Sequence, residues 1–425
     1  MPRLIILADD LTGAADTAAC FAQAGLRTVV ILSETGFFLD NPVSSFDLSD
    51  PPAVALPETF NQASYEVLSL STNTRQATPG QAALRVRQAV DWLQEHGLAD
   101  PGAFFYKKID SLLRGHPAVE LAAMQAALSL DRALVAPAFP AQGRFTLAGR
   151  QVVGSGDTAQ HIDLRQVFGS PPTEPTGIHW LPLDHAASAG PAGQAWNAAD
   201  PGLYIADAAS EDDLEALARG ALAQGIRLAC GSAGLARALQ RVAFTPESRA
   251  PANRPARSRL GRRTGRPVLV VAGSRAPALL RQVEAARRSG IRVVTPGPSF
   301  LEGAPFHTEE LASALAETLR RGQPAILTTA GLPLSPLGDT VIAGRLAGVA
   351  SSVVKAGLVG GLLLTGGDTA AAVCQRLGAH LIELTGEPLP GIAAGALLDG
   401  PHSGLPVITK AGAFECDLGL LIVDF

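Results

Sequence analysis

The sequence has little cysteine and no long hydrophobic run. Its 425 residues include four cysteines, which are far apart and form no CxxC pair, namely Cys20, Cys230, Cys374 and Cys416. This spacing argues against a thiolate zinc site and is typical of a reducing compartment. The apolar run over 357–364 is too short to cross a bilayer, and Asp9 and Asp10 interrupt any signal-like segment at the start. We therefore expect a cytoplasmic protein with no membrane partner.

Two common nucleotide-binding motifs are also missing. No GxxxxGK[ST] sequence occurs, which excludes a P-loop, and no GxGxxG follows a strand with an acidic residue downstream. A dehydrogenase stays an alternative that nicotinamide binding would revive. The net charge of -5 argues against a nucleic-acid partner held by bulk electrostatics.

Lysine is rare as well. The chain has 34 basic residues, of which 30 are arginines, and its four lysines are Lys107, Lys108, Lys355 and Lys410. Because the chain uses arginine by default, a retained lysine indicates a position that needs a compact ammonium group. Lys355 fits a surface helix, whereas the other three lie in segments with other signs of chemistry.

The composition and length predict a globular protein of two domains. Hydrophobic residues make up 47% and charged residues 17% of the chain. Strands that alternate with helices predict two α/β domains with mostly parallel sheets and a cleft between them. Residues 243–267 are rich in Pro, Arg, Ser and Gly and read as a linker. We expect a first domain over 1–242 and a second over 268–425, with a loop over 33–58.

The expected elements follow from apolar runs and helical periodicity. In the first domain we expect strands over Leu4–Ala8, Thr28–Leu32, Val67–Leu70, Phe104–Tyr106, Ala133–Ala136, Leu203–Ala206 and Leu228–Cys230, and helices over Ala14–Gln23, Gly80–Glu95, Pro117–Leu128 and Glu211–Gln224. In the second we expect strands over Val268–Val271, Val293–Val294, Ala325–Thr328, Leu362–Leu364 and Val407–Lys410, and helices over Ala276–Arg288 and Ala370–Leu377.

Two adjacent carboxylates, Asp9 and Asp10, stand where the first strand ends and the first helix begins. In open α/β sheets, ligands bind at the carboxyl ends of strands. The pair could hold substrate hydroxyls, accept a proton or help to hold a cation. The alternative is structural: one aspartate caps the helix and the other is solvated.

A cluster of charge follows the strand at 104–106. Lys107, Lys108, Asp110 and Arg114 lie within eight positions. Arg114 and a lysine could clamp a carboxylate while Asp110 binds hydroxyls, and Arg75 at another strand end could be a second anion clamp. A surface ion-pair group without a ligand is the alternative.

Glycine-bearing turns recur at strand ends in the second half. Gly366, Gly367, Asp368 and Thr369 lie between a strand and a helix, Gly273–Ser274 repeats that arrangement, and Gly412 follows Lys410. Glycines let backbone N–H groups approach an anion, and a helix N-terminus favours negative charge. Three such turns make a nucleotide ligand plausible.

These segments, in this order, resemble the four-carbon acid sugar kinase family, which includes threonate, erythronate and 3-oxo-tetronate kinases. The segments that carry the resemblance are 8–13 with Asp16 and Thr17, 108–111 with 113–115, 136–140, 231–234, 273–274, 365–369 and 409–412. Three places depart from the family pattern: Leu112 stands where a threonine is usual, Ala413–Glu415 replaces a Phe-Gly sequence, and residues 154–165 lack the expected acidic-threonine and Asp-Pro pattern.

The resemblance implies an N-terminal domain for the sugar acid and a C-terminal domain for ATP. The expected substrate-binding residues are Asp9, Arg75, Lys107, Lys108, Ser111 and Arg114, and the expected ATP-binding residues are Ser274, Gly366, Gly367, Asp368, Thr369, Lys410 and Gly412. A homodimer is a further expectation from the resemblance.

The expected reaction is transfer of the ATP γ-phosphoryl group to a terminal hydroxyl of a short sugar acid, with Mg²⁺ bridging the phosphates. Asp10 is the candidate that orients or deprotonates the hydroxyl, and Asp110 is the second candidate; the sequence does not choose between them. The metal ligands and the identity of the acid stay open. A non-catalytic regulator that binds a sugar acid or nucleotide is the alternative function.

Overall fold

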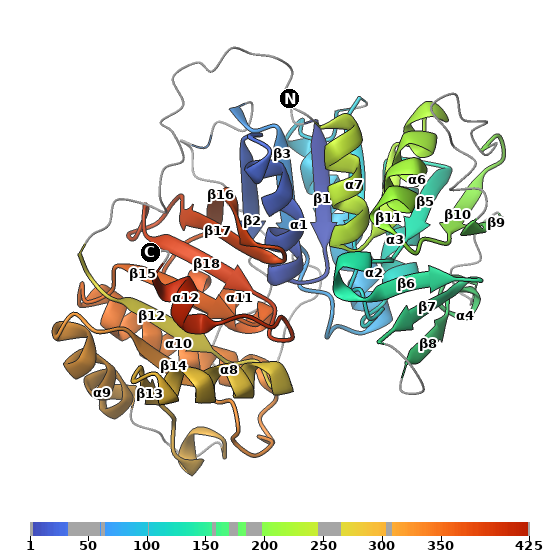
Figure 1. The fold of residues 1–425 in the computed structure, drawn as a ribbon. Helices are drawn as coiled ribbons and strands as arrows, with labels where there is room; N and C mark the ends of the chain where they lie inside the picture. Colours follow the sequence, from blue (N-terminus) through green and yellow to red (C-terminus); the bar gives the residue numbers. More distant parts are fainter. Residues whose placement is uncertain are drawn as a thin grey trace. The chain divides into compact units, whose positions relative to one another are not determined.

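The computed structural model of the protein describes residues 3–32, 60, 64–100, 102–154, 159–169, 177–183, 198–244, 265–302 and 308–423. The chain divides into two compact units (Figure 1). Unit 1 comprises Met1–Thr28 and Asn61–Ser248, and unit 2 comprises Val29–Phe60 and Arg249–Phe425. The loop expected over 33–58 and most of the expected linker lie outside the described residues. Within the described part of the chain, no helix is long and apolar enough to cross a membrane.

Unit 1 contains a parallel sheet with the strand order β3-β1-β4-β11-β5-β10-β9. The strands are β1 (Leu4–Ala8), β3 (Val67–Ser71), β4 (Phe104–Lys108), β5 (Arg132–Ala136), β9 (Ile178–Leu181), β10 (Gly202–Ala206) and β11 (Leu228–Gly231). The strands β1, β3 and β4 are buried along their whole length, which explains why they read as continuous apolar runs. All seven strands expected in the first domain are confirmed as strands. The second of them, β2 (Thr28–Leu32), belongs to unit 2 from Val29 on, not to unit 1.

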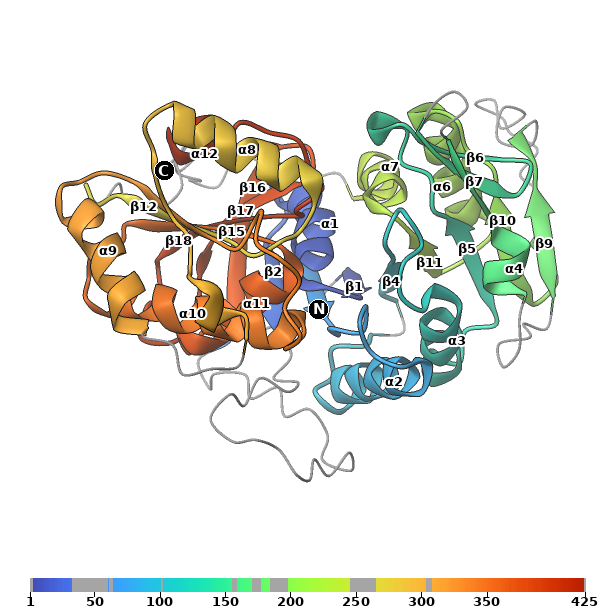
Figure 2. The ribbon, with the colours of Figure 1, turned by 90° about the horizontal axis from the view of Figure 1, so that it is seen from below.

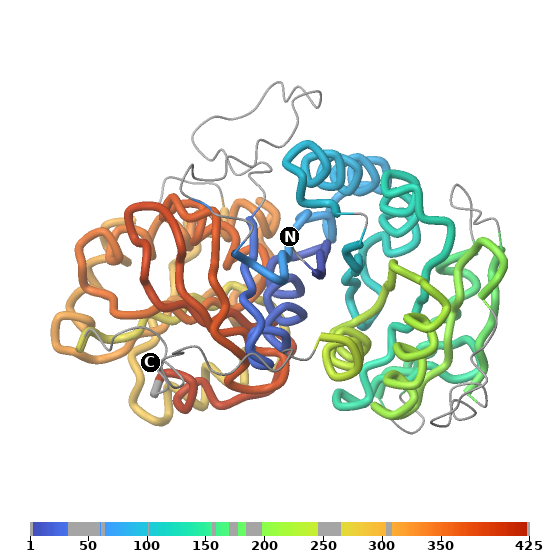
Figure 3. Tube along the Cα trace, turned by 90° about the horizontal axis from the view of Figure 1, so that it is seen from above, coloured from blue at the N-terminus to red at the C-terminus, as the bar shows by residue number. Residues whose placement is uncertain are grey.

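Helices cover both faces of this sheet. Figure 2 shows α6 and α7 on one side of the strands and α2, α3 and α4 on the other. The helices are α1 (Leu11–Gln23), α2 (Pro79–Glu95), α3 (Pro117–Leu128), α4 (Leu164–Phe168), α6 (Glu211–Ala223) and α7 (Ala233–Ala243). The packed pair α2 and α3 can be followed side by side in the Cα trace (Figure 3). The sequence analysis missed α7, which begins directly after the glycine-bearing turn at 231–232.

A small antiparallel sheet adds to unit 1 in the region where the sequence pattern was weak. It has the order β6-β7-β8, with β6 (Arg144–Leu147), β7 (Arg150–Val153) and β8 (Gln160–Asp163). The hairpin turn between β6 and β7 is fixed by the buried Asp207, whose carboxylate accepts hydrogen bonds from the backbone of Ala148 at 2.8 Å and Gly149 at 2.9 Å. This anchor holds β6 beside the carboxyl end of β10.

In unit 2 the strands follow the order β13-β14-β12-β15-β18-β17-β16-β2. Its remaining strands are β12 (Val268–Ala272), β13 (Arg292–Val294), β14 (Ala325–Thr328), β15 (Gly361–Thr365), β16 (Leu381–Leu389), β17 (Ile392–Leu397) and β18 (Pro406–Lys410). The first five are parallel, as expected, whereas β17 runs antiparallel to both β16 and β18. The sequence analysis missed β16 and β17. The strands of both units are mostly parallel, as expected, but unit 2 also has an antiparallel part.

Two helix layers enclose the strands of unit 2. Figure 2 shows α8 (Pro277–Arg288) and α12 (Leu418–Val423) on one face, and α9 (Thr308–Arg320), α10 (Asp339–Lys355) and α11 (Gly367–Arg376) on the other. Ala272, Ile408, Leu279 and Leu418 share one buried cluster on the α8 face. The helices α9 and α10 were missed, and α11 begins at Gly367 rather than at Ala370. The segment 367–369 is therefore the first helical turn.

Candidate active site

The register of the unit 1 strands brings three loops to one edge. Ala8, the last residue of β1, lies opposite Ser71 of β3 and Lys108 of β4. Because parallel strands in register end together, the segments that start at Asp9, Thr72 and Ile109 emerge side by side. The structure thus brings the predicted aspartates close to the charged segment after β4.

Asp10 caps the helix that follows it. It has extended backbone angles, and its Oδ1 accepts a hydrogen bond of 2.7 Å from the Gly13 backbone. Its Oδ2 accepts one of 2.9 Å from the Thr12 hydroxyl and one of 2.5 Å from Arg75 Nη1. The structural alternative is therefore right about a cap, but Asp10 also faces a guanidinium group.

Asp9 is buried rather than solvated. Only 2% of the residue is exposed. Arg75 Nε and Nη2 each donate to one of its carboxylate oxygens at 2.8 Å, which is a bidentate pair. The part of the structural alternative that placed the second aspartate in solvent is wrong.

The arginine favours the ionised form of Asp9. Burial alone would raise the pKa of Asp9, but the charge and hydrogen bonds of Arg75, together with the charges of Lys107 and Lys108, lower it. Burial alone would lower the pKa of Arg75, but Asp10 and Asp9 raise it well above its ordinary value. Asp9, Asp10, Arg75, Lys107 and Lys108 thus form an ionic cluster in which negative and positive charges largely compensate each other.

The two lysines of β4 lie in different surroundings. Neighbouring strand residues point to opposite faces. The Lys107 side chain is fully buried, its Nζ lies 2.8 Å from Glu120 Oε2, and the Thr74 hydroxyl donates to the same oxygen at 2.7 Å. Lys108 instead approaches the start of α1, because a Cβ added at Gly13 would lie 2.9 Å from its Nζ. Glycine at position 13 therefore makes room for the Lys108 ammonium group beside Asp10.

Asp110 and Arg114 form a second ion pair at this edge. Arg114 donates to Asp110 Oδ2 through Nε at 2.5 Å and to Oδ1 through Nη2 at 3.1 Å. Burial would raise the pKa of Asp110, but the hydrogen bond from Arg114 and the charges of Arg75, Arg114 and Lys108 lower it from 3.8 to about 2. The side chain of Arg114 is 58% exposed, so its outer face is accessible to a ligand.

Arg144 joins this cluster, and the sequence analysis did not select it. It begins β6, and its Nη1 donates a hydrogen bond to the Ser111 hydroxyl. Burial lowers the pKa of Arg144, and Asp110 opposes that effect. Gln151 of β7 fixes the hairpin here, because its Nε2 donates to the Ser111 carbonyl at 3.1 Å. A sequence signal existed: Arg144 follows the turn after β5, at the same sheet edge.

The predicted nucleotide residues of unit 2 also meet at one edge. Ala272 lies opposite Thr365, and Thr365 lies opposite Lys410, so β12, β15 and β18 end together. Ser274 stands between two glycine turns. A Cβ at Gly412 would lie 2.3 Å from Ser274 Cβ, and one at Gly366 would lie 3.4 Å from it. Only a residue without a side chain fits at Gly412.

The helix α11 starts at this edge with its backbone donors facing outward. Gly366, at a φ of +99°, precedes the helix and offers no side-chain cap. Its own N–H donates to the Lys410 carbonyl at 3.0 Å, which ties the turn to β18. The first N–H groups of a helix have no partner within the helix, so this end of α11 can receive an anion.

Three polar groups on the same two strands are buried without a partner. Among the described residues, Lys410 Nζ, Thr365 Oγ1 and Thr409 Oγ1 have no hydrogen-bond partner. Lys410 is fully buried, and burial lowers its pKa. Thr365 and Lys410 lie in register and point to the same face, which is the α8 face because Ile408 lies two residues earlier. An unpaired buried ammonium group is costly to the fold.

The described residues contain no group of three or more His, Cys, Asp or Glu side chains arranged to hold a metal ion by themselves. Asp368, in the first turn of α11, is the carboxylate at the glycine turns.

Comparisons with known proteins match two family models to successive parts of the chain. Residues 4–239 match a family described as a sugar-binding N-terminal domain, and residues 269–414 match one described as a nucleotide-binding C-terminal domain. The first match contains the ionic cluster, and the second contains the glycine turns.

Full-length relatives and a solved fold extend the match. A D-threonate kinase of Bordetella bronchiseptica is 33% identical, covering 97% of this chain and 94% of its own length. A D-erythronate kinase of Heliobacterium modesticaldum is 28% identical, covering 100% of this chain and 97% of its own length. A solved protein of Salmonella typhimurium LT2 superposes with a TM-score of 0.72 at 20% identity, covering 100% of this chain and 98% of that one, which shows the same fold.

Proposed function

Because the chain belongs to the four-carbon acid sugar kinase family, we propose that it transfers the γ-phosphoryl group of ATP to a terminal hydroxyl of a four-carbon sugar acid. The observation that carries this proposal is the cluster at the carboxyl edge of unit 1. There, buried aspartates and cations lie together where an α/β sheet binds its ligands. Threonate, erythronate and their oxo forms are the candidate acids.

The cations of unit 1 would hold the substrate carboxylate. Arg114 is paired with Asp110 through one face and exposes the rest of its guanidinium group. Arg144 and Lys108 flank the same segment. Lys107 is enclosed and paired with Glu120, so we assign it a supporting role beneath the site rather than contact with the substrate.

Asp10 is the proposed acceptor of the reacting hydroxyl. An ionised carboxylate has about four acceptor positions, and Gly13, Thr12 and Arg75 occupy three of them. One position on Oδ1 is left for a substrate hydroxyl. Phosphoryl transfer depends more on positioning and charge neutralisation than on a strong base, so a carboxylate fixed in place by Arg75, Thr12 and Gly13 suits the task. Asp110 would bind another hydroxyl.

Ser274, Gly366, Gly412 and the start of α11 would hold the ATP phosphates. The close approach of the two glycine turns to Ser274 supports this assignment. Lys410 would supply positive charge from beneath the turns, and the phosphates would give its ammonium group, which has no hydrogen-bond partner in the described part of the chain, a counter-charge. Domain closure would exclude water from the reaction.

Mg²⁺ is the metal that this reaction calls for. It usually keeps several waters and binds through one or two carboxylates together with the nucleotide phosphates. A single carboxylate at the glycine turns, Asp368, fits that mode. The ion would neutralise phosphate charge, while the side chains of the chain position the acid. We also infer a cytoplasmic location, where ATP is available.

The test is ADP release with a panel of D-threonate, L-threonate, D-erythronate and their oxo forms. We expect acid-dependent turnover with at least one of them. Turnover with none, although the protein binds ATP, would contradict the proposal and favour a non-catalytic nucleotide-binding regulator.

The role of Asp10 has its own test. We expect Asp10→Asn to lower kcat by roughly 100-fold or more, as loss of a positioned proton acceptor does. Thr12→Val is the matched control, because it removes one hydrogen bond of the same carboxylate and keeps the charge. If Asp10→Asn turns over like the control and Asp110→Asn does not, the acceptor is Asp110.

A further inference from the structure

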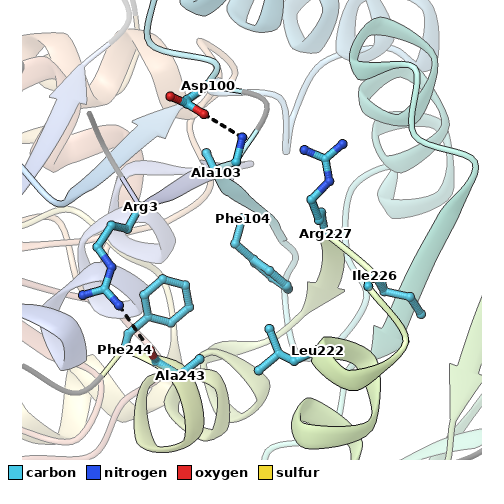
Figure 4. A pocket seen from close by; sticks show the side chains of 11 residues that line it. Arg3, Asp100, Ala103, Phe104, Leu222, Ile226, Arg227, Ala243 and Phe244 are labelled. Atoms are coloured by element: carbon cyan, nitrogen blue, oxygen red, sulfur yellow. Dashed lines mark hydrogen bonds between the residues drawn. The ribbon is translucent and has the colours of Figure 1, made fainter. Parts of the chain in front are cut away.

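A groove lies at the opposite edge of the unit 1 sheet from the ionic cluster. It is formed where β1, β4 and β11 begin and where α6 and α7 end, and its volume is about 480 Å³ (Figure 4). Binding sites for small molecules typically have volumes of this order. The side chains that matter to the argument are Arg3, Phe104, Leu222, Ile226, Arg227 and Phe244.

The wall of the groove is aromatic and aliphatic. Phe104 and Phe244 pack edge to face with 6.2 Å between ring centroids, and both are largely buried. Leu222 and Ile226 continue the apolar surface on the side of α6 (Figure 4). Phe104, Phe244 and Ile226 expose only a few per cent of their surface and Leu222 exposes more, so a ligand here would meet a narrow apolar surface that suits a small apolar body.

Two guanidinium groups flank this apolar wall. Arg3 donates a hydrogen bond of 3.4 Å from Nη2 to the Ala243 carbonyl, its Cζ lies 5.6 Å above the Phe244 ring, and its Nη1 is 4.0 Å from Glu66 Oε1. In the described part of the chain, the guanidinium group of Arg227 has no hydrogen bond or ion pair, whereas its main-chain carbonyl accepts a hydrogen bond from Phe105. Arg227 can therefore take an anionic ligand without giving up a partner.

The acidic side chain in the groove, Asp100, offsets only part of this charge. Asp100 Oδ1 accepts a hydrogen bond of 2.6 Å from the Gly102 backbone, and the Asp100 carbonyl accepts one of 2.9 Å from Ala103. This carboxylate thus belongs to the turn before β4. In Figure 4, Asp100 and Arg227 are drawn without a contact between them. The groove carries a net positive charge beside an apolar wall.

We propose that this groove binds a small organic carboxylate with a flat apolar body. The carboxylate would pair with Arg227, in the bidentate geometry that guanidinium groups favour, and the body would lie against Phe104, Phe244 and Leu222. A sugar acid carries an oxygen atom on every carbon and would leave this wall uncovered, so the ligand class differs from that of the proposed substrate. The inference does not depend on the proposed phosphoryl transfer.

The test uses benzoate as the probe and benzyl alcohol as its neutral match, with binding to the full-length protein followed by ligand-detected NMR titration. We expect benzoate to bind roughly 10-fold more tightly than benzyl alcohol, as expected for one charge-assisted pair. Arg227→Gln should abolish that difference. Arg219 is an exposed arginine of α6 that pairs with Glu215. The control variant Arg219→Gln should leave the difference between the two probes intact.

Three results would overturn the inference. They are equal binding of benzoate to the wild type and to Arg227→Gln, equal binding of the two probes, and displacement of benzoate by D-threonate, which would place the probe in the other site. Leu222→Trp keeps the test valid if Arg227→Gln unfolds, because it fills the groove without touching the charge and should also block benzoate. An unchanged thermal unfolding profile of each variant is the control for folding.

Discussion

The carboxyl ends of the strands in unit 1 and in unit 2 differ in how their charged side chains are paired. In unit 1, Asp9, Asp10 and Asp110 each have an arginine partner, so the edge is nearly balanced without a ligand. In unit 2, Lys410 is fully buried and lacks a partner among the described residues. Both edges lie at the carboxyl ends of parallel strands. The charged side chains of the unit 1 edge pair with one another, whereas Lys410 at the unit 2 edge pairs with no described side chain.

This difference indicates how each edge would meet its ligand. A ligand at the unit 1 edge meets side chains that are already held in place, which favours precise orientation. A ligand at the unit 2 edge would supply the missing counter-charge, so part of its binding energy would come from relieving an unfavourable buried charge. Four substitutions test this contrast.

The largest effect should come from Arg75→Met. Removing one partner of a buried ionic group leaves the others uncompensated, which typically costs about 3–5 kcal/mol. Here both Asp9 and Asp10 lose a partner. Urea unfolding of unit 1 can be followed by tryptophan fluorescence, because the tryptophans that the structure describes, Trp92 and Trp180, belong to unit 1. Arg219→Met is the exposed control. Equal stability of the two variants would contradict the claim that the ion pairs of Arg75 stabilise unit 1.

Asp110→Asn should have an effect that depends on pH. The folded pKa of Asp110 is lowered from 3.8 to about 2, so its ionised form stabilises unit 1 above pH 4, and this contribution is lost as the pH falls toward 2. The shift corresponds to about 2 kcal/mol. The stability difference between the wild type and the variant should therefore shrink between pH 5 and pH 2. A difference that is constant with pH would show that the ion pair is not responsible.

Gly412→Ala should destabilise unit 2 by about 1–3 kcal/mol, as overpacking does. The new Cβ would overlap the Ser274 side chain. The double variant with Ser274→Gly should recover most of the stability, because it removes the clashing atoms. Unfolding by circular dichroism measures both, and an absence of recovery would mean that the two turns do not meet as described.

Lys410→Met should have the smallest effect and the opposite sign. Replacing an unpartnered buried ammonium group with an apolar chain of similar length should stabilise the ligand-free unit 2 by about 1–2 kcal/mol. The same change should abolish most of the shift in unfolding temperature that ATP produces in the wild type. If Lys410→Met is less stable than the wild type and its unfolding temperature still rises with ATP, the proposed difference between the two strand edges is wrong.

Much of the fold could be read from local sequence. The strands β1, β2 and β14 and the helix α3 have the bounds that were expected, because a continuous apolar run or an initial proline defines each of them. The helices α7, α9 and α10 and the pair β16 and β17 were missed. The helix α10 contains several glycines and serines, and β17 is rich in alanine, so their packing rather than their propensity sets their structure.

The candidate site divides in the same way. Position after a strand end was enough to select Asp9, Asp10, Arg75 and Asp110. It was not enough to find Arg144, which reaches Ser111 from a separate small sheet, or to tell Lys107 from Lys108. The two lysines are adjacent in sequence, and only the direction of each side chain from β4 puts one into an ion pair with Glu120 and the other beside Gly13.

By itself, the sequence determined which residues carry charge, where strands stop and which turns lack side chains, because these are properties of neighbouring residues. The tertiary structure decided the partners: which arginine each aspartate meets, which lysine is enclosed, and which ammonium group has no hydrogen-bond partner among the described residues. Such pairings join residues that are far apart in the chain, and their energies depend on burial and distance, which only the packed fold sets.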